Sequence, residues 1–300
     1  MKPQQFGLVA SLRHRAVTPE GGLFRWASTC ADSVRALGLK LHAVGGTAGA
    51  LEAGSALAGY AGLVPYEGGR EGGLMRLVSH VAGATAPGAT LDGVIYLVDP
   101  VDPTTLYPEA LALKRQCVIH QKPFISTLAG AIEWVAVEAV LAGVPAVGAA
   151  EAFDLERKTI ALIAHDALKQ NMVDFAAEHF DLLSRCPARV ATGTTGGLLN
   201  QLAWSRGWPS DKPWVQRFLS GPMGGDAQIA ELVLDHRCDK VLFFEDPHVA
   251  RQHEADIQLL ERAVCAVGER ATCASSLAMA SRWALAASMA GLGPRDAARG

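Results

Sequence analysis

The feature that most constrains the fold of this chain is an internal duplication. Strand-like runs alternate with helix-like runs in the first half of the 300 residues, and the same order returns in the second half. A repeat of that kind means that one structural unit is used twice. The matched pairs are Leu8-Val9-Ala10 with Leu162-Ile163-Ala164, Gly46-Thr47 with Gly193-Thr194, Gly72-Gly73 with Gly224-Gly225, and Asp99-Pro100 with Asp246-Pro247.

The order of the runs predicts the fold class. Strands that alternate with helical segments favour a mostly parallel sheet with crossover helices. We therefore expect two tandem α/β domains, each a sheet flanked by helices. The Ala/Gly/Pro-rich stretch Gly143–Glu151 marks the join, so the predicted domains are 1–150 and 151–300. Each is long enough to bury a core of its own.

Composition limits the partners and the compartment. The net charge is −3, which leaves no general basic footprint for nucleic acid or an anionic membrane. The apolar runs are too short for a membrane span, and the first residues lack the apolar core of a signal peptide. The six cysteines form no Cys-x-x-Cys pair and are expected to be reduced thiols. We expect a soluble cytoplasmic protein.

A glycine-rich loop in the second half holds one carboxylate. In Leu219–Gln228, Asp226 follows two glycines and precedes an amphipathic run that is typical of a helix. Glycines allow a close approach between backbone and ligand, which suits Asp226 to act as a general base. The alternative is a surface turn in which Asp226 caps the helix.

Other polar groups of the second half predict an anion pocket. The run Thr192-Gly-Thr-Thr-Gly196 follows a strand and precedes a helix, so Thr192, Gly193, Thr194 and Thr195 offer hydroxyl and N–H donors to an anion. Ser220 and Gly221 extend this set, and Lys169 adds a positive charge. The alternative for the threonine run is an ordinary turn in which a threonine caps the helix.

A histidine and two carboxylates complete the candidate site. His253 suits an electrophile at a carbonyl oxygen, and Asp256, three residues later, could orient its ring. Asp246 lies at the C-terminal end of a strand, where ligand sites of α/β folds gather. These three residues could instead bind a divalent metal, but no further ligands stand out, so we expect no metal. We expect His165 to contact the substrate.

The motifs of the second half resemble those of methylglyoxal synthases. The shared stretches are Ala164-His-Asp-Ala-Leu-Lys-Gln170, Ala191-Thr-Gly-Thr-Thr-Gly196, Leu219-Ser-Gly-Pro-Met-Gly-Gly-Asp226 and Phe243-Phe-Glu-Asp-Pro247, with His253 and Asp256 downstream. The resemblance implies a Rossmann-like fold and a lyase, without a cofactor, that converts dihydroxyacetone phosphate into methylglyoxal and phosphate. It implies that Asp226 is the catalytic base and that His165, Lys169, Thr192–Thr195, Ser220, Gly221 and His253 bind substrate.

The second half departs from the family in two places. The segment between Gly197 and Ser220, which holds Trp204, Trp208 and Trp214, is longer than usual. Cys273 stands where the family usually has Asn. These differences bear on substrate access and specificity more than on the chemistry.

The first half keeps the sheet-forming runs and loses the polar site. Ser11 stands for His165, Leu12 for Asp166, Leu74 for Asp226, Leu106 for His253, Gly45 and Ala48 for Thr192 and Thr195, Arg15 for Lys169, and Glu109 for Asp256. We expect this half to be non-catalytic and to replace one subunit of the homohexamer that the family forms. The expected assembly is a dimer or trimer of two-domain chains.

Two other functions remain open at this stage. Domains of the same resemblance serve as allosteric ligand-binding units in carbamoyl-phosphate synthetase, and a regulator would be expected to lose Asp226. A cyclohydrolase of purine synthesis is a weaker alternative, because the Gly-Pro-Met-Gly-Gly-Asp motif is intact. Retention of both Asp226 and the anion pocket favours the enzyme.

Overall fold

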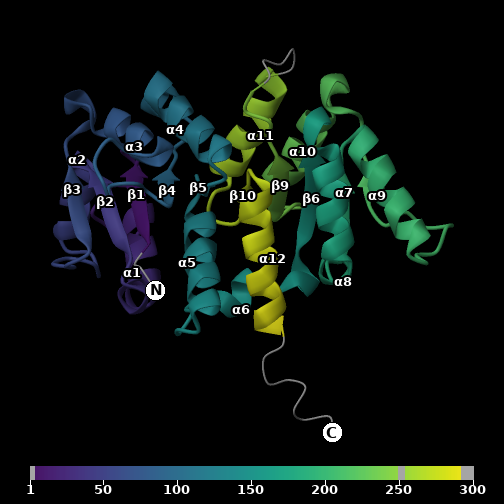
Figure 1. Ribbon diagram of the computed structural model, residues 1–300, viewed down its shortest axis with the longest axis horizontal. Helices are drawn as coiled ribbons and strands as arrows, with labels where there is room; N and C mark the ends of the chain where they lie inside the picture. Colours follow the sequence, from purple (N-terminus) through teal and green to yellow (C-terminus); the bar gives the residue numbers. More distant parts are fainter. Residues whose placement is uncertain (1–3, 249–253, 292–300) are drawn as a thin grey trace, which may run out of the picture. The chain divides into compact units, whose positions relative to one another are not determined.

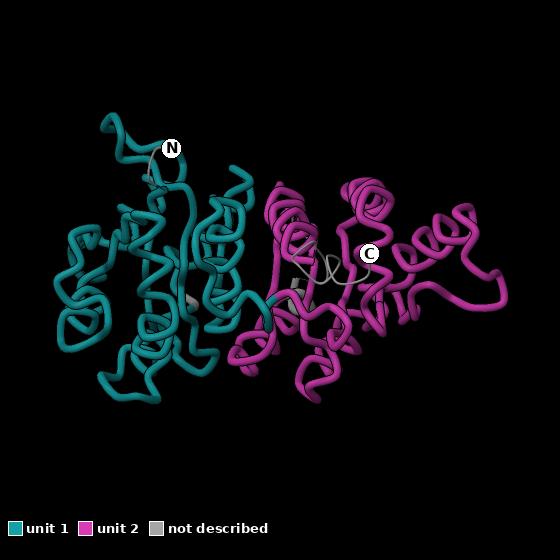
Figure 2. Tube along the Cα trace, turned by 90° about the horizontal axis from the view of Figure 1, so that it is seen from below, with its two compact units in different colours: residues 1–152, 292–300 teal, residues 153–291 magenta. Residues whose placement is uncertain are grey.

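The computed structural model describes residues 4–248 and 254–291, and the chain divides into two compact units (Figure 2). The first unit runs to Ala152, and the second is formed by Phe153–Gly291. Within the described residues, none of the helices has both the length and the apolarity needed to cross a bilayer.

The first unit is a parallel sheet with the strand order β3-β2-β1-β4-β5 (Figure 1). Helices α1 and α5 pack together, and so do α3 and α4. The strands are β1 (Gln5–Ala10), β2 (Lys40–Val44), β3 (Leu63–Tyr66), β4 (Gly93–Leu97) and β5 (Phe124–Ile125). The helices are α1 (Gly22–Leu37), α2 (Gly45–Glu52), α3 (Gly73–Ala82), α4 (Pro108–Ile119), α5 (Leu128–Ala142) and α6 (Ala149–Ala152).

The second unit repeats this order with the sheet β8-β7-β6-β9-β10, again parallel. Helix α10 packs on α11, and α7 packs on both α9 and α12. The strands are β6 (Thr159–Ala164), β7 (Ala188–Ala191), β8 (Gln216–Arg217), β9 (Lys240–Phe244) and β10 (Thr272–Ala274). The helices are α7 (Lys169–Glu178), α8 (Phe180–Ser184), α9 (Gly193–Ser205), α10 (Gly225–Leu234), α11 (Glu254–Ala266) and α12 (Leu277–Gly291).

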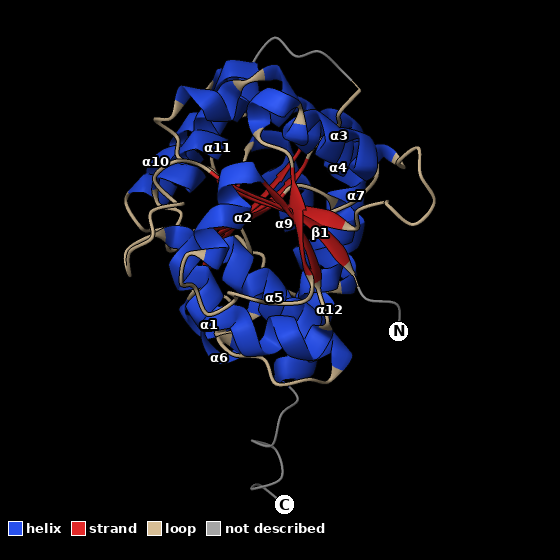
Figure 3. Ribbon diagram, turned by 90° about the vertical axis from the view of Figure 1, so that its left-hand side faces the viewer, coloured by secondary structure: helices blue, strands red, loops and turns tan. Residues whose placement is uncertain are grey.

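Each sheet is buried by helices, as Figure 3 shows by the strands lying inside a cover of helices. Strands β1, β6 and β9 carry nearly continuous apolar runs and are buried along most of their length. That pattern is expected for strands covered on both faces, because neither face needs polar side chains. The predicted α/β class with parallel sheets is confirmed.

Strand pairing fixes how the two units correspond. Leu8 pairs with Ala43 in the first unit, and Leu162 pairs with Ala191 in the second. Leu8 and Leu162 are equivalent, so their partners Ala43 and Ala191 are equivalent too. Two residues further along in each unit, Gly45 therefore corresponds to Gly193.

The match of Gly46-Thr47 with Gly193-Thr194 is therefore wrong by one residue. Gly45 corresponds to Gly193, and Thr47 corresponds to Thr195. Backbone contacts agree, because a Cβ on Gly45 would lie 2.7 Å from Cα of Gly68, and one on Gly193 would lie 2.9 Å from Cα of Ser220. The error arose because glycine and threonine recur in both loops.

The long segment after α9 is anchored by one buried arginine. Arg189 of β7 is 8% exposed, and its guanidinium donates to the carbonyl oxygens of Trp214 (2.7 Å), Leu183 (3.1 Å) and Cys186. The same guanidinium lies against the rings of Trp208 and Trp214, with centroid distances of 5.7 and 5.2 Å. The extra residues are thus tied to the body of the second unit.

We expect Arg189→Met to destabilise the second unit by about 3 kcal/mol, because it leaves several buried carbonyl groups without a donor. Arg206→Met is the matched control: Arg206 is exposed, and its guanidinium lies over the face of Phe180, 5.5 Å from the ring centroid. Its loss should cost about 1 kcal/mol or less. Urea unfolding of both variants checks this, and equal losses would contradict the anchoring role.

Candidate active site

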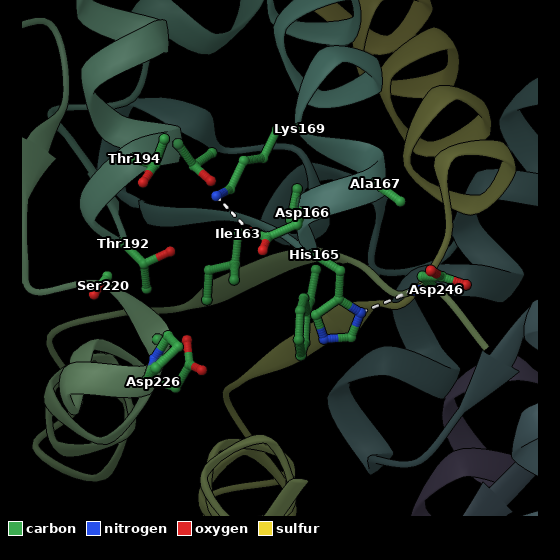
Figure 4. Close-up of a pocket in the computed structure, with 15 residues that line it drawn as sticks. Ile163, His165, Asp166, Ala167, Lys169, Thr192, Thr194, Ser220, Asp226 and Asp246 are labelled. Carbon is green, nitrogen blue, oxygen red and sulfur yellow. Dashed lines mark hydrogen bonds and ion pairs between the residues drawn. The ribbon is translucent and has the colours of Figure 1, made fainter. Parts of the chain in front are cut away.

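A cavity of about 390 Å³ opens at the C-terminal ends of β6, β7 and β9 (Figure 4). Parallel strands end on the same edge of a sheet, so residues far apart in sequence meet there. The described residues that line it are Ile163, Ala164, His165, Asp166, Ala167, Lys169, Thr192, Thr194, Thr195, Ser220, Gly221, Pro222, Asp226, Phe243 and Asp246. The volume suits a small ligand.

One side of the cavity carries hydrogen-bond donors that suit an anion. Helix α9 begins at Gly193, so the N–H groups of its first turn have no carbonyl acceptor within the helix. Thr194 and Thr195 lie in this turn and line the cavity. Thr195 is 1% exposed. Its hydroxyl group has no hydrogen-bond partner in the described part of the chain. A ligand oxygen would satisfy it.

Gly193 itself does not line this cavity. Its N–H donates to the carbonyl oxygen of Leu219 at 2.9 Å. Its missing Cβ lets Ser220 approach the helix, since a Cβ would lie 2.9 Å from Cα of Ser220. Gly193 therefore positions Ser220, and the N–H groups that remain for a ligand are those of Thr194 and Thr195.

Lys169 brings a positive charge to the same side. It is the first residue of α7, and its Nζ lies 2.6 Å from Oδ1 of Asp166 (Figure 4). The side chain of Asp166 is 96% exposed and that of Lys169 only 23%. An ion pair this exposed adds little stability, about 0.2–1 kcal/mol. What it provides is a fixed position for the ammonium group at the cavity.

Asp226 lies 3% exposed in the first turn of α10. The loop before it is held by its own backbone, with the N–H of Met223 and of Gly225 donating to the carbonyl oxygen of Ser220 at 2.9 and 3.0 Å. The side chain of Gln228 accepts from the N–H of Leu219 at 3.0 Å. The carboxylate thus sits on a rigid turn.

The ring of His165 is held in one orientation. Its Nδ1 accepts a hydrogen bond from the backbone N–H of Asp246 at 2.8 Å, and the ring of Phe243 packs against it edge-on at 4.7 Å between centroids. An accepting Nδ1 carries no proton, so in the neutral ring the proton is on Nε2, which is a donor. Figure 4 shows Nδ1 turned toward Asp246 and the other nitrogen toward the side of Asp226.

Asp246 contributes differently from the sequence prediction. Its backbone N–H holds His165, while its carboxylate Oδ1 accepts from the N–H of His248 at 2.9 Å. A catalytic role of the Asp246 carboxylate stays a prediction. Phe243 is the functional neighbour that the sequence analysis did not assign, although it stands in the Phe243–Pro247 motif.

His253 lies outside the described residues, and so does the side chain of Asp256, whose backbone belongs to α11. Both roles stay predictions. Across residues 4–248 and 254–291, histidines, cysteines and carboxylates form no group of three or more that could hold a metal ion.

The chain is similar to methylglyoxal synthases of other organisms over about half of its length. No family model matches the chain. The chain is 42% identical over 142 residues to a methylglyoxal synthase of Ralstonia nicotianae, which covers 47% of this chain and 96% of that protein. It is 46% identical over 121 residues to the methylglyoxal synthase of Cupriavidus metallidurans, covering 40% and 79%. A methylglyoxal synthase of Elizabethkingia anophelis has a solved structure that is 36% identical, covers 42% of this chain and 76% of its own, and aligns with a TM-score of 0.34.

Proposed function

The chain belongs to the methylglyoxal synthase family, and from that premise we propose that its second unit converts dihydroxyacetone phosphate into methylglyoxal and inorganic phosphate. One observation carries the proposal: a single cavity holds a buried carboxylate, Asp226, together with a lysine and an N-terminal helix turn that suit a phosphate group. A base and an anion site in one cavity are what an elimination of phosphate needs.

The proposed reaction begins with proton removal. The Asp226 carboxylate takes a proton from the hydroxymethyl carbon next to the carbonyl group, and the electron pair moves onto the carbonyl oxygen as an enediolate. A donor must hold that charge. The Nε2–H of His165 is suited to this because its tautomer is fixed by the N–H of Asp246. His253 is the second candidate donor, as the family resemblance implies.

The second step breaks the carbon–oxygen bond to phosphate. The remaining hydroxyl proton of the enediolate passes to the leaving phosphate, the former hydroxymethyl carbon becomes the aldehyde, and phosphate leaves with the bonding electrons. The product is the enolate of methylglyoxal, which takes back at its terminal carbon the proton that Asp226 removed. Lys169, the hydroxyl groups of Thr192 and Ser220, and the N–H groups of Thr194 and Thr195 would hold the leaving phosphate.

We propose that the first unit does not catalyse this reaction. Leu74 follows Gly73 in the loop that corresponds to Gly225-Asp226, so the position of the proposed base carries no carboxylate. The loops themselves have the same shape: a Cβ on Gly73 would lie 2.0 Å from the carbonyl oxygen of Glu67, and one on Gly225 would lie 1.9 Å from that of Leu219.

The test is an assay of the purified full chain with dihydroxyacetone phosphate. Methylglyoxal and inorganic phosphate are measured separately and should appear in equal amounts, faster than in a protein-free control. A protein that binds phosphate but forms no methylglyoxal would instead be a ligand-binding module of this fold, and the proposal would fail.

We expect Lys169→Ala to raise KM and to weaken inhibition by phosphate by a similar factor, about tenfold or more, because one charge serves both ligands. Lys212→Ala is the matched control, since Lys212 is an exposed lysine of the same unit outside the cavity. Initial rates over a range of substrate and phosphate concentrations check this. If phosphate at tens of millimolar leaves wild-type rates unchanged, the anion side of the cavity is misplaced.

A further inference from the structure

One side chain joins the two ends of the loop that leads to Asp226. The loop runs from Leu219, after β8, to Gly224, before α10. Gln228 is the fourth residue of α10, and its side-chain oxygen Oε1 accepts a hydrogen bond from the backbone N–H of Leu219 at 3.0 Å. The two residues are nine positions apart, so this bond closes the segment 219–228 into a ring. Asp226 lies within that ring.

The backbone of Leu219 continues the connection to the anion side of the cavity. Its carbonyl oxygen accepts from the N–H of Gly193, the first residue of α9, at 2.9 Å. The N–H of Leu219 is therefore bonded toward α10 and its carbonyl oxygen toward α9. Two hydrogen bonds in series thus link the helix of the proposed base to the helix whose first turn suits a phosphate group, and Gln228 makes one of them.

Gln228 acts at a distance from any ligand in the cavity. It is not among the described residues that line the cavity. Side chains two residues apart on a helix do not face each other, so Gln228 and Asp226 point in different directions from α10. An effect of Gln228 on the reaction therefore passes through the backbone of Leu219, which sets where α10 begins relative to α9.

The first unit has a different connection at the same place. Its loop corresponds to that of the second unit, with Glu67 at the position of Leu219 and Arg76 at the position of Gln228. The side chains of Arg76 and Glu67 form an ion pair at 3.2 Å, and they are 53% and 44% exposed. Such an exposed pair contributes little, and it uses no backbone group of the loop. The bond from side chain to backbone belongs to the unit that holds the proposed base.

Loss of the Gln228 bond should move the base relative to the anion side and leave the anion side itself unchanged. Ser220 stays joined to α9, because the bond between Gly193 and Leu219 does not involve Gln228. The start of α10 loses one of the bonds that hold it to the loop, and two backbone bonds inside the loop remain. A displacement of about 1 Å at a reacting group costs about 100-fold in rate, so a smaller shift should cost about tenfold.

We propose that Gln228 is a positioning residue that sets the distance between the Asp226 carboxylate and the first turn of α9. The proposal rests on the function proposed for the second unit, since it concerns the same cavity. Its consequence is specific: a ligand that spans both sides of the cavity depends on Gln228, and a ligand that occupies only the anion side does not.

Two ligands of different reach test this spacing in the purified full chain. Inorganic phosphate occupies the anion side, and phosphoglycolohydroxamate, a phosphate ester whose hydroxamate group resembles the enediolate, reaches both sides. We expect Gln228→Met to lower kcat and to weaken hydroxamate binding by about tenfold each, while the Kd of phosphate changes by less than about twofold. Methionine is of similar length, and its thioether is only a weak acceptor. Initial rates and titration calorimetry provide the three values.

Gln201→Met is the matched control, since Gln201 is an exposed glutamine of α9 outside the described lining of the cavity, and it should leave all three values unchanged. Gln228→Glu should restore most of the hydroxamate affinity and kcat, because a carboxylate oxygen also accepts from the N–H of Leu219. Melting curves ensure that the variants are folded.

The two proposals fail in different ways. A wild-type chain that forms no methylglyoxal, but whose hydroxamate binding still depends on Gln228, would refute the activity and support the positioning role. A folded Gln228→Met variant that keeps the wild-type hydroxamate affinity and kcat would overturn the positioning role, and so would an equal loss of affinity for phosphate and for the hydroxamate.

Discussion

Asp226→Asn is expected to lower kcat by roughly two to four orders of magnitude, the usual scale of general-base catalysis, while phosphate still binds. The amide has the size of the carboxylate and cannot accept the proton. Asp226 is 3% exposed and sits on a turn held by Ser220, so the substitution leaves the shape of the cavity intact. The loss should therefore appear in kcat and not in phosphate affinity.

Asp235→Asn separates this effect from a change of charge. Asp235 is exposed and follows the last residue of the same helix, α10. Asp235→Asn is therefore the same chemical change at a position away from the cavity. Its kcat should equal that of wild type. Steady-state rates and phosphate inhibition constants are measured for both variants. Activity of Asp226→Asn within a few-fold of wild type would remove Asp226 from the role of base.

Much of the fold was predictable because the sequence carries the same pattern twice. Buried parallel strands read as short apolar runs, and their polar ends must meet at one edge of the sheet, so Thr192 after β7 and His165 after β6 fall together. The grouping of these residues was predicted from the motifs shared with methylglyoxal synthases, and this geometric rule gives its physical reason.

What the sequence could not show is which atom of a residue faces the ligand. Asp246 was expected to act through its carboxylate, yet its backbone N–H is what fixes His165. Gly193 was expected to bind the ligand, yet its N–H is used by Leu219. Hydrogen bonds of the backbone depend on the local path of the chain, and side-chain types do not record that path.

The anchoring of the long segment between α9 and β8 could not be predicted from the sequence either. An arginine within a strand and tryptophans some twenty residues later have no periodic relation, so nothing in the pattern links Arg189 to Trp208 and Trp214. The structure explains why the extra residues are tolerated. None of residues 198–219 is among the described residues that line the cavity.

Gly225→Ala is expected to lower kcat/KM by about 100-fold, the scale of a displacement of about 1 Å at a reacting group. A Cβ at Gly225 would lie 1.9 Å from the carbonyl oxygen of Leu219 and 2.7 Å from its carbonyl carbon. These are backbone atoms, so the loop itself must move. Asp226 is the next residue, and Ser220 lies on the same loop, so both sides of the cavity shift together.

The duplication provides a control for this variant that few chains offer. Gly73 has the same surroundings in the first unit, since a Cβ there would lie 2.0 Å from the carbonyl oxygen of Glu67, and Leu74 follows it where Asp226, the proposed base, follows Gly225. Gly73→Ala and Gly225→Ala should therefore destabilise their units by similar amounts, about 1–3 kcal/mol. Only Gly225→Ala should reduce turnover, because only its loop carries the proposed base, Asp226. Melting temperatures and kcat/KM are measured for both variants. An equal loss of activity in Gly73→Ala would mean that the first unit takes part in catalysis.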